Sequence, residues 1–271
     1  LSMITGMIPT MALSNAAAGA TDRAEQLGIP LVEVAGNAVY STAYTIYTIP
    51  TSLIVVSIAT AMFTRLSQHA ADGNMDAMRR DTSKTLRMVS TLMALCTVLM
   101  VVLAVPISRV LALTISPAEV MTLSYSLIAM VIGLVGIGAV NVLDRAYYAF
   151  EDTRGAFWIN LPFQILGLVG FALCGFLPPR LIVIGIGLVS SLTNILSVFL
   201  LAHFLRQRMG GVDGKRLLRV HLQLIAVSVV TTVVGFFLMK PLMAAWHLDA
   251  NVLLSIVAVA LLTPILSLIY F

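Results

Sequence analysis

The sequence has 271 residues, of which 59% are hydrophobic and 10% are charged, and its mean hydropathy is +1.01. An ordinary soluble domain carries about a quarter charged residues, so this composition excludes a water-soluble fold. The net charge is +4, and the positions of the basic residues favour a role in membrane topology over nucleic-acid binding.

Long apolar runs alternate with short polar connections along the whole chain. A helix rises 1.5 Å per residue, so about 20 apolar residues cross a bilayer core of about 30 Å. Strands of a membrane barrel would instead alternate in polarity over about 10 residues. The runs therefore predict an all-α membrane protein with eight transmembrane helices, at about 2–20, 36–63, 86–113, 118–143, 155–177, 180–204, 218–239 and 250–271.

The chain begins at Leu1 and enters an apolar run at once, without a basic n-region or a cleavage site. A signal peptide is therefore not predicted, and we expect the chain to be part of a longer protein that has lost an N-terminal portion. Twelve of the sixteen Lys and Arg residues lie at the second, fourth and sixth connections. Because cytoplasmic loops retain basic residues, both ends of this segment are predicted to face the cytoplasm.

The second span, GNAVYSTAYTIYTIPTSL, is unusually polar. Tyr40, Tyr44, Tyr47 and Thr51 recur at spacings of four, three and four, which places them on one helical face. Pro50 removes a backbone hydrogen bond and predicts a kink near mid-membrane. We expect this face to line a wet cavity. The alternative is a belt of interfacial tyrosines, with threonine hydroxyls bonded to their own helix.

Further amides fall inside other spans, where buried polar groups are costly and mark pathways. Asn160 and Gln164 share a face of the fifth span, Asn15 lies in the first, and Asn194 is a lone amide in the sixth. Interhelical hydrogen bonding without a transport role is an equal alternative for these residues. The predicted cavity-lining residues are Asn15, Asn37, Tyr40, Tyr44, Thr45, Thr48, Thr51, Asn160 and Gln164.

Charged and amide residues also crowd the end of the fourth span. Asn141, Asp144 and Arg145 are predicted to gate its cytoplasmic side, the alternative being an ordinary charged helix end. The connection at 65–84 is interpreted as a solvated loop. The alternative is a turn at Asp72, Gly73 and Asn74 between two amphipathic segments on the membrane surface, with a regulatory contact there.

No enzymatic pattern stands out in the sequence. It contains no P-loop, and His69, His203, His221 and His247 are scattered at predicted helix ends without metal-ligand spacing. We therefore predict no catalytic residues, no metal and no cofactor, and no nucleic-acid partner.

Two stretches carry a resemblance to a known family. The run YTIYTIPTSLIVVSIATAMFTRLSQHAADGNMDAMRRDTSKTLRM resembles the eighth and ninth helices of the MurJ/MviN family of lipid II flippases. The stretch VLDRAYYAFEDTRGAF is similar to that family's junction between the tenth and eleventh helices. The family belongs to the multidrug/oligosaccharidyl-lipid/polysaccharide exporter superfamily.

The resemblance implies one lobe of a fourteen-helix transporter in the bacterial cell membrane. Residues 1–205 would form the second six-helix lobe, and residues 206–271 a cytoplasmic loop and an additional C-terminal helix pair. The implied activity is alternating-access transfer of undecaprenyl-linked peptidoglycan precursor to the outer leaflet. The implied partners are this precursor, membrane lipids, the missing N-terminal lobe and cell-wall synthesis proteins. Alternatives are a polysaccharide-repeat or drug/cation exporter of the same superfamily, or a membrane scaffold for cell-wall assembly that transports nothing.

One feature departs from the family pattern. Family members often carry a cationic residue shortly before the central proline of the eighth helix, whereas Tyr44, Thr45, Ile46 and Tyr47 stand there in this chain. Either the N-terminal lobe supplies the charge for a pyrophosphate, or the substrate differs from lipid II.

Overall fold

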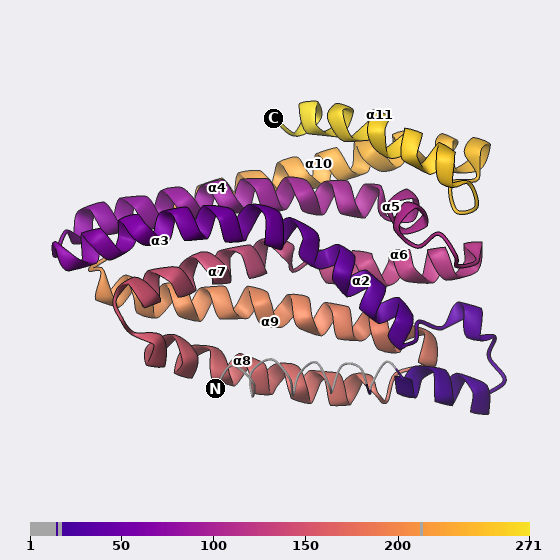
Figure 1. Ribbon diagram of the computed structural model, residues 1–271, viewed down its shortest axis with the longest axis horizontal. Coiled ribbons are helices and arrows are strands. Elements are labelled where there is room, and N and C mark those ends of the chain that lie inside the picture. The colour runs from indigo at the N-terminus through magenta and orange to yellow at the C-terminus, as the bar shows by residue number, and fades with distance from the viewer. Residues whose placement is uncertain (1–14, 16–17, 212–213) are drawn as a thin grey trace.

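The computed structural model describes residues 15, 18–211 and 214–271, and every regular element in these ranges is helical (Figure 1). The all-α prediction is confirmed. The helices are α2 (Asn37–Pro50), α3 (Val56–Ala71), α4 (Met75–Val102), α5 (Ala104–Leu111), α6 (Pro117–Val131), α7 (Leu134–Ala149), α8 (Thr153–Cys174), α9 (Pro179–Arg208), α10 (Gly214–Trp246) and α11 (Val252–Tyr270).

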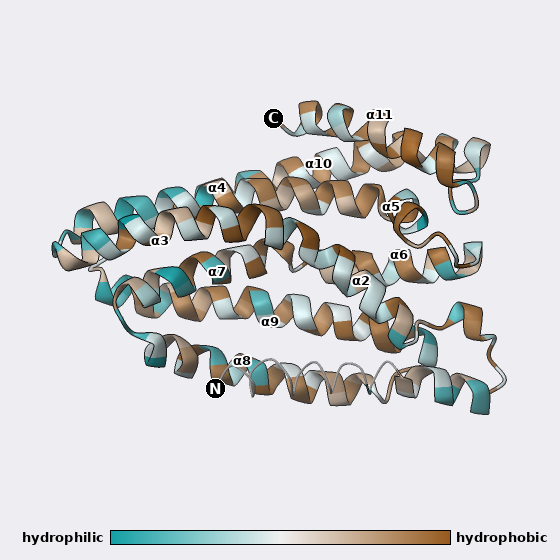
Figure 2. Ribbon diagram, viewed as in Figure 1, coloured by the Kyte–Doolittle hydropathy of each residue, from teal (hydrophilic) through white to brown (hydrophobic). Residues whose placement is uncertain are grey.

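Within the described residues, six helices are long and apolar enough to span a membrane. The pair α6 and α7 raises the number to seven if it forms one bent span. The predicted count of eight is therefore not established, because the first expected span, 2–20, lies largely outside the described residues. Figure 2 shows hydrophobic residues along the middle of the helices and hydrophilic residues gathered towards their ends, as a bilayer requires.

The second predicted span is one long helical segment with a local change of geometry after Pro50. A π-helical turn, Thr51–Val55, follows α2 and leads directly into α3. Proline lacks an N–H and its ring pushes away the carbonyl four residues earlier, so Pro50 disturbs the helix on its N-terminal side. The wider π-helical turn follows on its C-terminal side. Figure 1 shows α2 running obliquely to α3, so the kink predicted at Pro50 lies at this turn.

The interpretation of residues 65–84 as a solvated loop was wrong. Helix α3 continues to Ala71, and α4 begins at Met75, where the Asn74 side chain accepts a hydrogen bond of 3.0 Å from the Ala77 N–H. Only a tight turn separates the helices, and Gly73 adopts a φ of 65° there. The charged residues of this stretch are good helix formers. Helix α4 is therefore about 42 Å long and extends beyond a membrane core of about 30 Å.

The fourth predicted span is not continuous. Helices α6 and α7 meet at an angle of 42° across a break at 132–133. At the break, the backbone of α9 approaches so closely that a Cβ added to Gly133 would lie 2.5 Å from the Cα of Ser191. Glycine is therefore required at this crossing.

Two hydroxyl groups from neighbouring helices satisfy carbonyls at the break. The Ser191 hydroxyl on α9 lies 2.9 Å from the Ala129 carbonyl oxygen and 3.0 Å from that of Met130. The Thr97 hydroxyl on α4 lies 2.9 Å from the Met93 carbonyl of its own helix and 3.3 Å from the carbonyl oxygen of Val131. The Met130 carbonyl also accepts from the Gly133 N–H at 3.2 Å. A bend weakens the hydrogen bonds within a helix, and a bilayer core offers no water to replace them. The bend is thus built into the packing of three helices.

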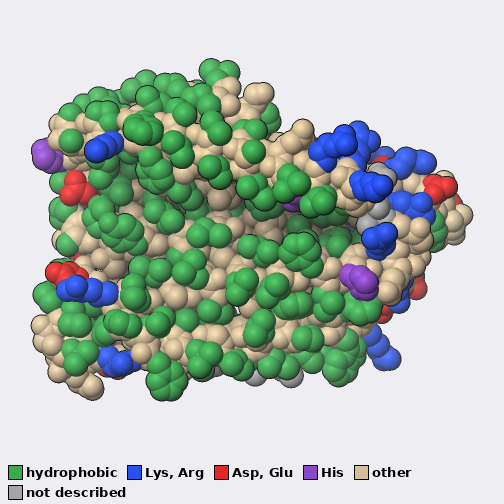
Figure 3. Space-filling view, turned by 180° about the vertical axis from the view of Figure 1, so that it is seen from behind, with side chains coloured by type: hydrophobic (Ala, Val, Ile, Leu, Met, Phe, Trp, Pro, Cys, Tyr) green, Lys and Arg blue, Asp and Glu red, His purple; other side chains and the backbone are tan. Residues whose placement is uncertain are grey.

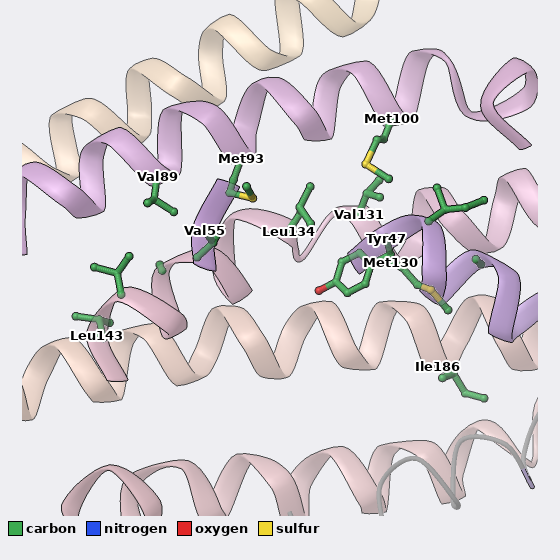
Figure 4. Packing of buried hydrophobic residues seen from close by; sticks show 14 of the residues in the cluster. Tyr47, Val55, Val89, Met93, Met100, Met130, Val131, Leu134, Leu143 and Ile186 are labelled. Atoms are coloured by element: carbon green, nitrogen blue, oxygen red, sulfur yellow. The ribbon is translucent and has the colours of Figure 1, made fainter. Parts of the chain in front are cut away.

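The buried apolar residues form two clusters. The larger one joins α2, α3, α4, α6, α7, α8 and α9, and Figure 4 shows part of it, including Tyr47, Met93, Met130 and Ile186. The smaller one lies between α4 and α5 on one side and α10 and α11 on the other, and contains Val98, Val102, Met239, Leu262 and Leu266. Helices α10 and α11, called here the C-terminal pair, pack on the outside of the bundle (Figure 1).

Candidate functional site

A cavity of about 200 Å³ lies among α2, α6, α7, α8 and α9. Every described side chain that lines it is uncharged, and aromatic, amide and hydroxyl groups predominate. The lining residues are Tyr40, Tyr44, Tyr47, Met130, Ile137, Phe163, Gln164, Gly167, Phe171, Ser190, Thr193, Asn194 and Ser197.

One wall of the cavity is made by Tyr40, Tyr44 and Tyr47 of α2, called here the tyrosine ladder. Their spacing of four and three residues places them on one face. Neighbouring ring centroids are 6.1 Å apart in both pairs, and the Tyr40 and Tyr44 rings stack with an interplanar angle of 25°. Tyr40 and Tyr47 are buried, whereas Tyr44 is 49% exposed. The accessible ring of Tyr44 therefore lies in the middle of the ladder, between two buried rings.

The facing walls come from α8 and α9. Phe163, Gln164, Gly167 and Phe171 project from α8, and four polar residues project from α9. The two walls meet where the Asn194 amide of α9 and the Tyr47 hydroxyl of α2 lie close together in the lining. Polar groups of both walls therefore meet at the Tyr47 end of the ladder.

Ser190, Thr193 and Ser197 of α9 were not predicted as cavity residues, although Asn194 was noted as a lone amide. The signal in the sequence was the spacing of Ser190, Asn194 and Ser197, four and three residues apart. That pattern is the same as the one in the tyrosine ladder, and it marks one face of a helix.

The predicted cavity residues divide into two groups. Tyr40, Tyr44 and Gln164 line the cavity. The remaining six do not appear in its lining: Asn15 and Asn37 are exposed, Thr45 and Thr48 donate hydrogen bonds of 2.9 Å to carbonyls of their own helix, Thr51 begins the π-helical turn, and Asn160 bonds to α7.

The predicted gate residues lie on α7, towards its C-terminal end. The Asn160 Nδ2 of α8 donates a hydrogen bond to Oδ1 of Asp144 over 3.1 Å, which joins a predicted cavity residue to a predicted gate residue. Asn141 donates over 2.9 Å to the Ile137 carbonyl of its own helix. Arg145 is partly buried beside Asp144. The described contacts thus connect α7 to α8 through one carboxylate–amide pair.

A second set of contacts fixes the α7–α8 junction to α9. The Tyr147 hydroxyl donates to the Leu201 carbonyl over 3.0 Å, and the Arg208 guanidinium lies 6.0 Å from the centre of the Tyr147 ring. Arg208 also forms an ion pair of 2.6 Å with Asp152, the residue that caps α8. Sequence reasoning missed this pair because its two residues belong to connections far apart along the chain.

Basic side chains collect at the end of the molecule that carries the α3–α4 turn, as Figure 3 shows for one face. Asp81 lies among them and accepts contacts from Arg65 at 2.7 Å and His69 at 3.2 Å. Among the residues that the structure describes, no cluster of His, Cys, Asp or Glu has the geometry of a metal site.

Comparison with known proteins gives two matches of different kinds. The family model described as lipid II flippase MurJ matches residues 7–267. A solved structure of lipid II flippase MurJ in an inward closed conformation superimposes with a TM-score of 0.62 at 20% sequence identity. The match covers 86% of this chain and 47% of that one, so the chain spans about half the length of that flippase. A search of curated proteins gives no match.

The structural likeness, at this identity, shows a shared fold. The family model matches nearly the whole chain and includes every helix that lines the cavity. The chain therefore belongs to the MurJ lipid II flippase family.

Proposed function

We propose that this chain is one lobe of a transporter that moves lipid II from the inner to the outer leaflet of the bacterial cell membrane by alternating access. The observation that carries the proposal is an uncharged polar cavity between spanning helices of a chain in this family. Polar groups inside a membrane are costly, and they recur where a substrate passes.

In this proposal, residues 1–205 form the six-helix lobe and residues 206–271 add a loop and the C-terminal pair. The two apolar clusters support that division. The buried residues of the cavity helices belong to the larger cluster, whereas those of α10 and α11 belong to the smaller one. A second lobe, on the missing part of the polypeptide, would close the cavity from the other side. The chain's coverage of about half of the matched flippase agrees with this arrangement.

The Asp144–Asn160 contact is proposed to hold the cytoplasmic side of the lobe. Asn160 precedes Gln164 by one helical turn, so the contact lies next to the cavity along α8. Asn141 and Arg145 flank it on α7. Rocking of the two lobes would require α7 and α8 to move relative to each other. Breaking the one hydrogen bond to the Asp144 carboxylate would cost about 1.5 to 3 kcal/mol of free energy, which is small enough for such a motion.

The proposed orientation has both ends of this segment in the cytoplasm. The basic residues of alternating connections support it, because they would all lie at the end that carries the α3–α4 turn. The precursor would then enter from the basic end, which suits a headgroup with negative charges.

Depletion of the full-length protein in cells tests the function. We expect lipid II to accumulate in the inner leaflet and to fall in the outer leaflet, measured by labelling intact cells with a reagent that does not cross the membrane. Normal outer-leaflet lipid II after depletion would exclude the proposal. A selective loss of a polysaccharide precursor or of drug export would favour the corresponding alternative cargo.

A further inference from the structure

We propose that the cavity is a sugar-binding subsite, which takes one pyranose ring of the lipid-linked headgroup while the pyrophosphate is bound elsewhere. The proposal deepens the proposed function and rests on it, because the ligand is part of the transported lipid. Three chemical groups of such a lipid compete for the site: the pyrophosphate, the polyprenyl tail and the sugars.

The charge of the lining argues against pyrophosphate. Each described lining residue is uncharged, and Phe163 and Phe171 contribute apolar surface. Phosphate sites in proteins supply Arg, Lys or clustered backbone N–H groups, because a desolvated anion without such partners is strongly disfavoured. The tyrosines before Pro50 are therefore expected to contact a part of the substrate other than the pyrophosphate.

The polar groups argue against the lipid tail. Asn194 and Gln164 each offer an amide with donor and acceptor atoms, and Ser190 and Thr193 offer hydroxyl oxygens. The Ser190 and Thr193 hydroxyls donate to carbonyls of α9 over 2.9 to 3.0 Å, which leaves their oxygens available as acceptors. A hydrocarbon chain in this cavity could not bond to the remaining donor and acceptor positions of these groups.

A sugar ring matches the chemistry of both walls of the cavity, the aromatic wall of α2 and the polar wall of α8 and α9. The C–H bonds on one face of a pyranose carry partial positive charge and pack on the electron-rich face of an aromatic ring. The Tyr40 and Tyr44 rings stack with an interplanar angle of 25°, and Tyr44 is half-exposed in the middle of the ladder. The hydroxyl and acetamido groups on the ring edge can bond to Gln164 and Asn194. A cavity of about 200 Å³ suits one ring and not the whole headgroup.

The test compares two probes on the purified full-length protein: lipid II, and undecaprenyl pyrophosphate, which lacks the sugars. Tyr44→Leu keeps an apolar side chain and removes the aromatic face, whereas Tyr44→Phe keeps the face. Tyr125→Leu is the matched control, because Tyr125 lies on α6, is 53% exposed and does not appear in the cavity lining.

We expect Tyr44→Leu to weaken lipid II binding about tenfold and to change undecaprenyl pyrophosphate binding less than about twofold. Tyr44→Phe and Tyr125→Leu should bind both probes like the wild type. Retained binding of undecaprenyl pyrophosphate by Tyr44→Leu also shows that this variant is folded.

Equal loss of both probes in Tyr44→Leu overturns the subsite, because the ladder would then contact a part that the two lipids share. Unchanged binding of both probes overturns it as well. A wild-type protein that binds neither probe overturns the proposed function itself. This outcome is seen in the wild type, whereas failure of the subsite alone is seen only in the variants.

Discussion

Asn160 of α8 and Asp144 of α7 form a hydrogen bond of 3.1 Å between two partly buried side chains. Removing the donor leaves a carboxylate without this partner, whereas Asp144→Asn keeps an acceptor oxygen and removes the charge. We expect Asn160→Ala to lower the free energy of unfolding by about 1.5 to 3 kcal/mol and Asp144→Asn to lower it by less. Thermal unfolding of the purified full-length protein measures both, and equal losses would contradict a role for the charge-assisted bond.

The α6–α7 break gives a second prediction. A Cβ at Gly133 would lie 2.5 Å from the Cα of Ser191, so Gly133→Ala must push α9 away and lower the melting temperature. Gly167→Ala is the control, because its Cβ would meet only side-chain atoms at 3.8 Å and alanine favours a helix by about 0.5 to 1 kcal/mol. An equal response of the two variants in thermal unfolding would show that α9 does not require the close approach.

The same break depends on the Ser191 hydroxyl, which is 3% exposed and lies within hydrogen-bond distance of two carbonyl oxygens. Ser191→Ala should cost about 1 to 3 kcal/mol, because it removes the donor that α9 supplies to the Ala129 carbonyl. The Met130 carbonyl keeps the Gly133 N–H at 3.2 Å. Ser190→Ala is the neighbouring control, since that hydroxyl bonds within its own helix. The comparison is made by thermal unfolding, and an unaffected Ser191→Ala would contradict the bridging role.

Asp152 has two separable roles at the start of α8. Its Oδ1 accepts a hydrogen bond of 2.7 Å from the Gly155 N–H, and its other oxygen pairs with Arg208 at 2.6 Å. Asp152→Asn keeps the cap and should cost at most about 1 kcal/mol, because Arg208 is 45% exposed. Asp152→Ala loses both interactions and should cost about 0.5 to 2 kcal/mol more. Unfolding of the two variants tests this order, and a larger effect of Asp152→Asn would reverse the assignment.

The C-terminal pair packs closely on α4. A Cβ at Gly235 would lie 2.7 Å from a Val102 methyl group, so Gly235→Leu should detach α10 and raise proteolysis between α9 and α10. Gly214→Leu is the control on the same helix, because nothing lies within 4 Å of its Cβ position. The readout is the rate of proteolytic cleavage of the purified protein, and equal rates in the two variants would contradict tight docking.

Local spacing predicted the parts of the molecule that depend on one helix. The all-helical fold followed from the length of the apolar runs, and the common face of Tyr40, Tyr44 and Tyr47 followed from helical periodicity. The kink was predictable because Pro50 cannot donate a hydrogen bond.

Features that depend on two or three helices were not predictable in this way. Asn160 and Asp144 were assigned to a cavity and to a gate, and nothing in their separation of sixteen residues indicates that they touch. No proline marks the break at Gly133 in the sequence. The break depends on Ser191 of α9, a helix that is far away along the chain but packs against it. For the hairpin of α3 and α4, a turn at 72–74 between two amphipathic segments was the alternative to a solvated loop. The loop was preferred because charge was interpreted as loop character, although Arg, Lys and Met favour helices.

Translocation by the purified full-length protein in liposomes tests the central claim most directly. Labelled lipid II is placed in one leaflet, and its arrival in the other is followed with a quencher that does not cross the membrane. We predict translocation above that of protein-free liposomes, reduced in Tyr44→Leu and retained in Tyr125→Leu. Binding of lipid II without translocation would contradict the transporter account and favour a scaffold.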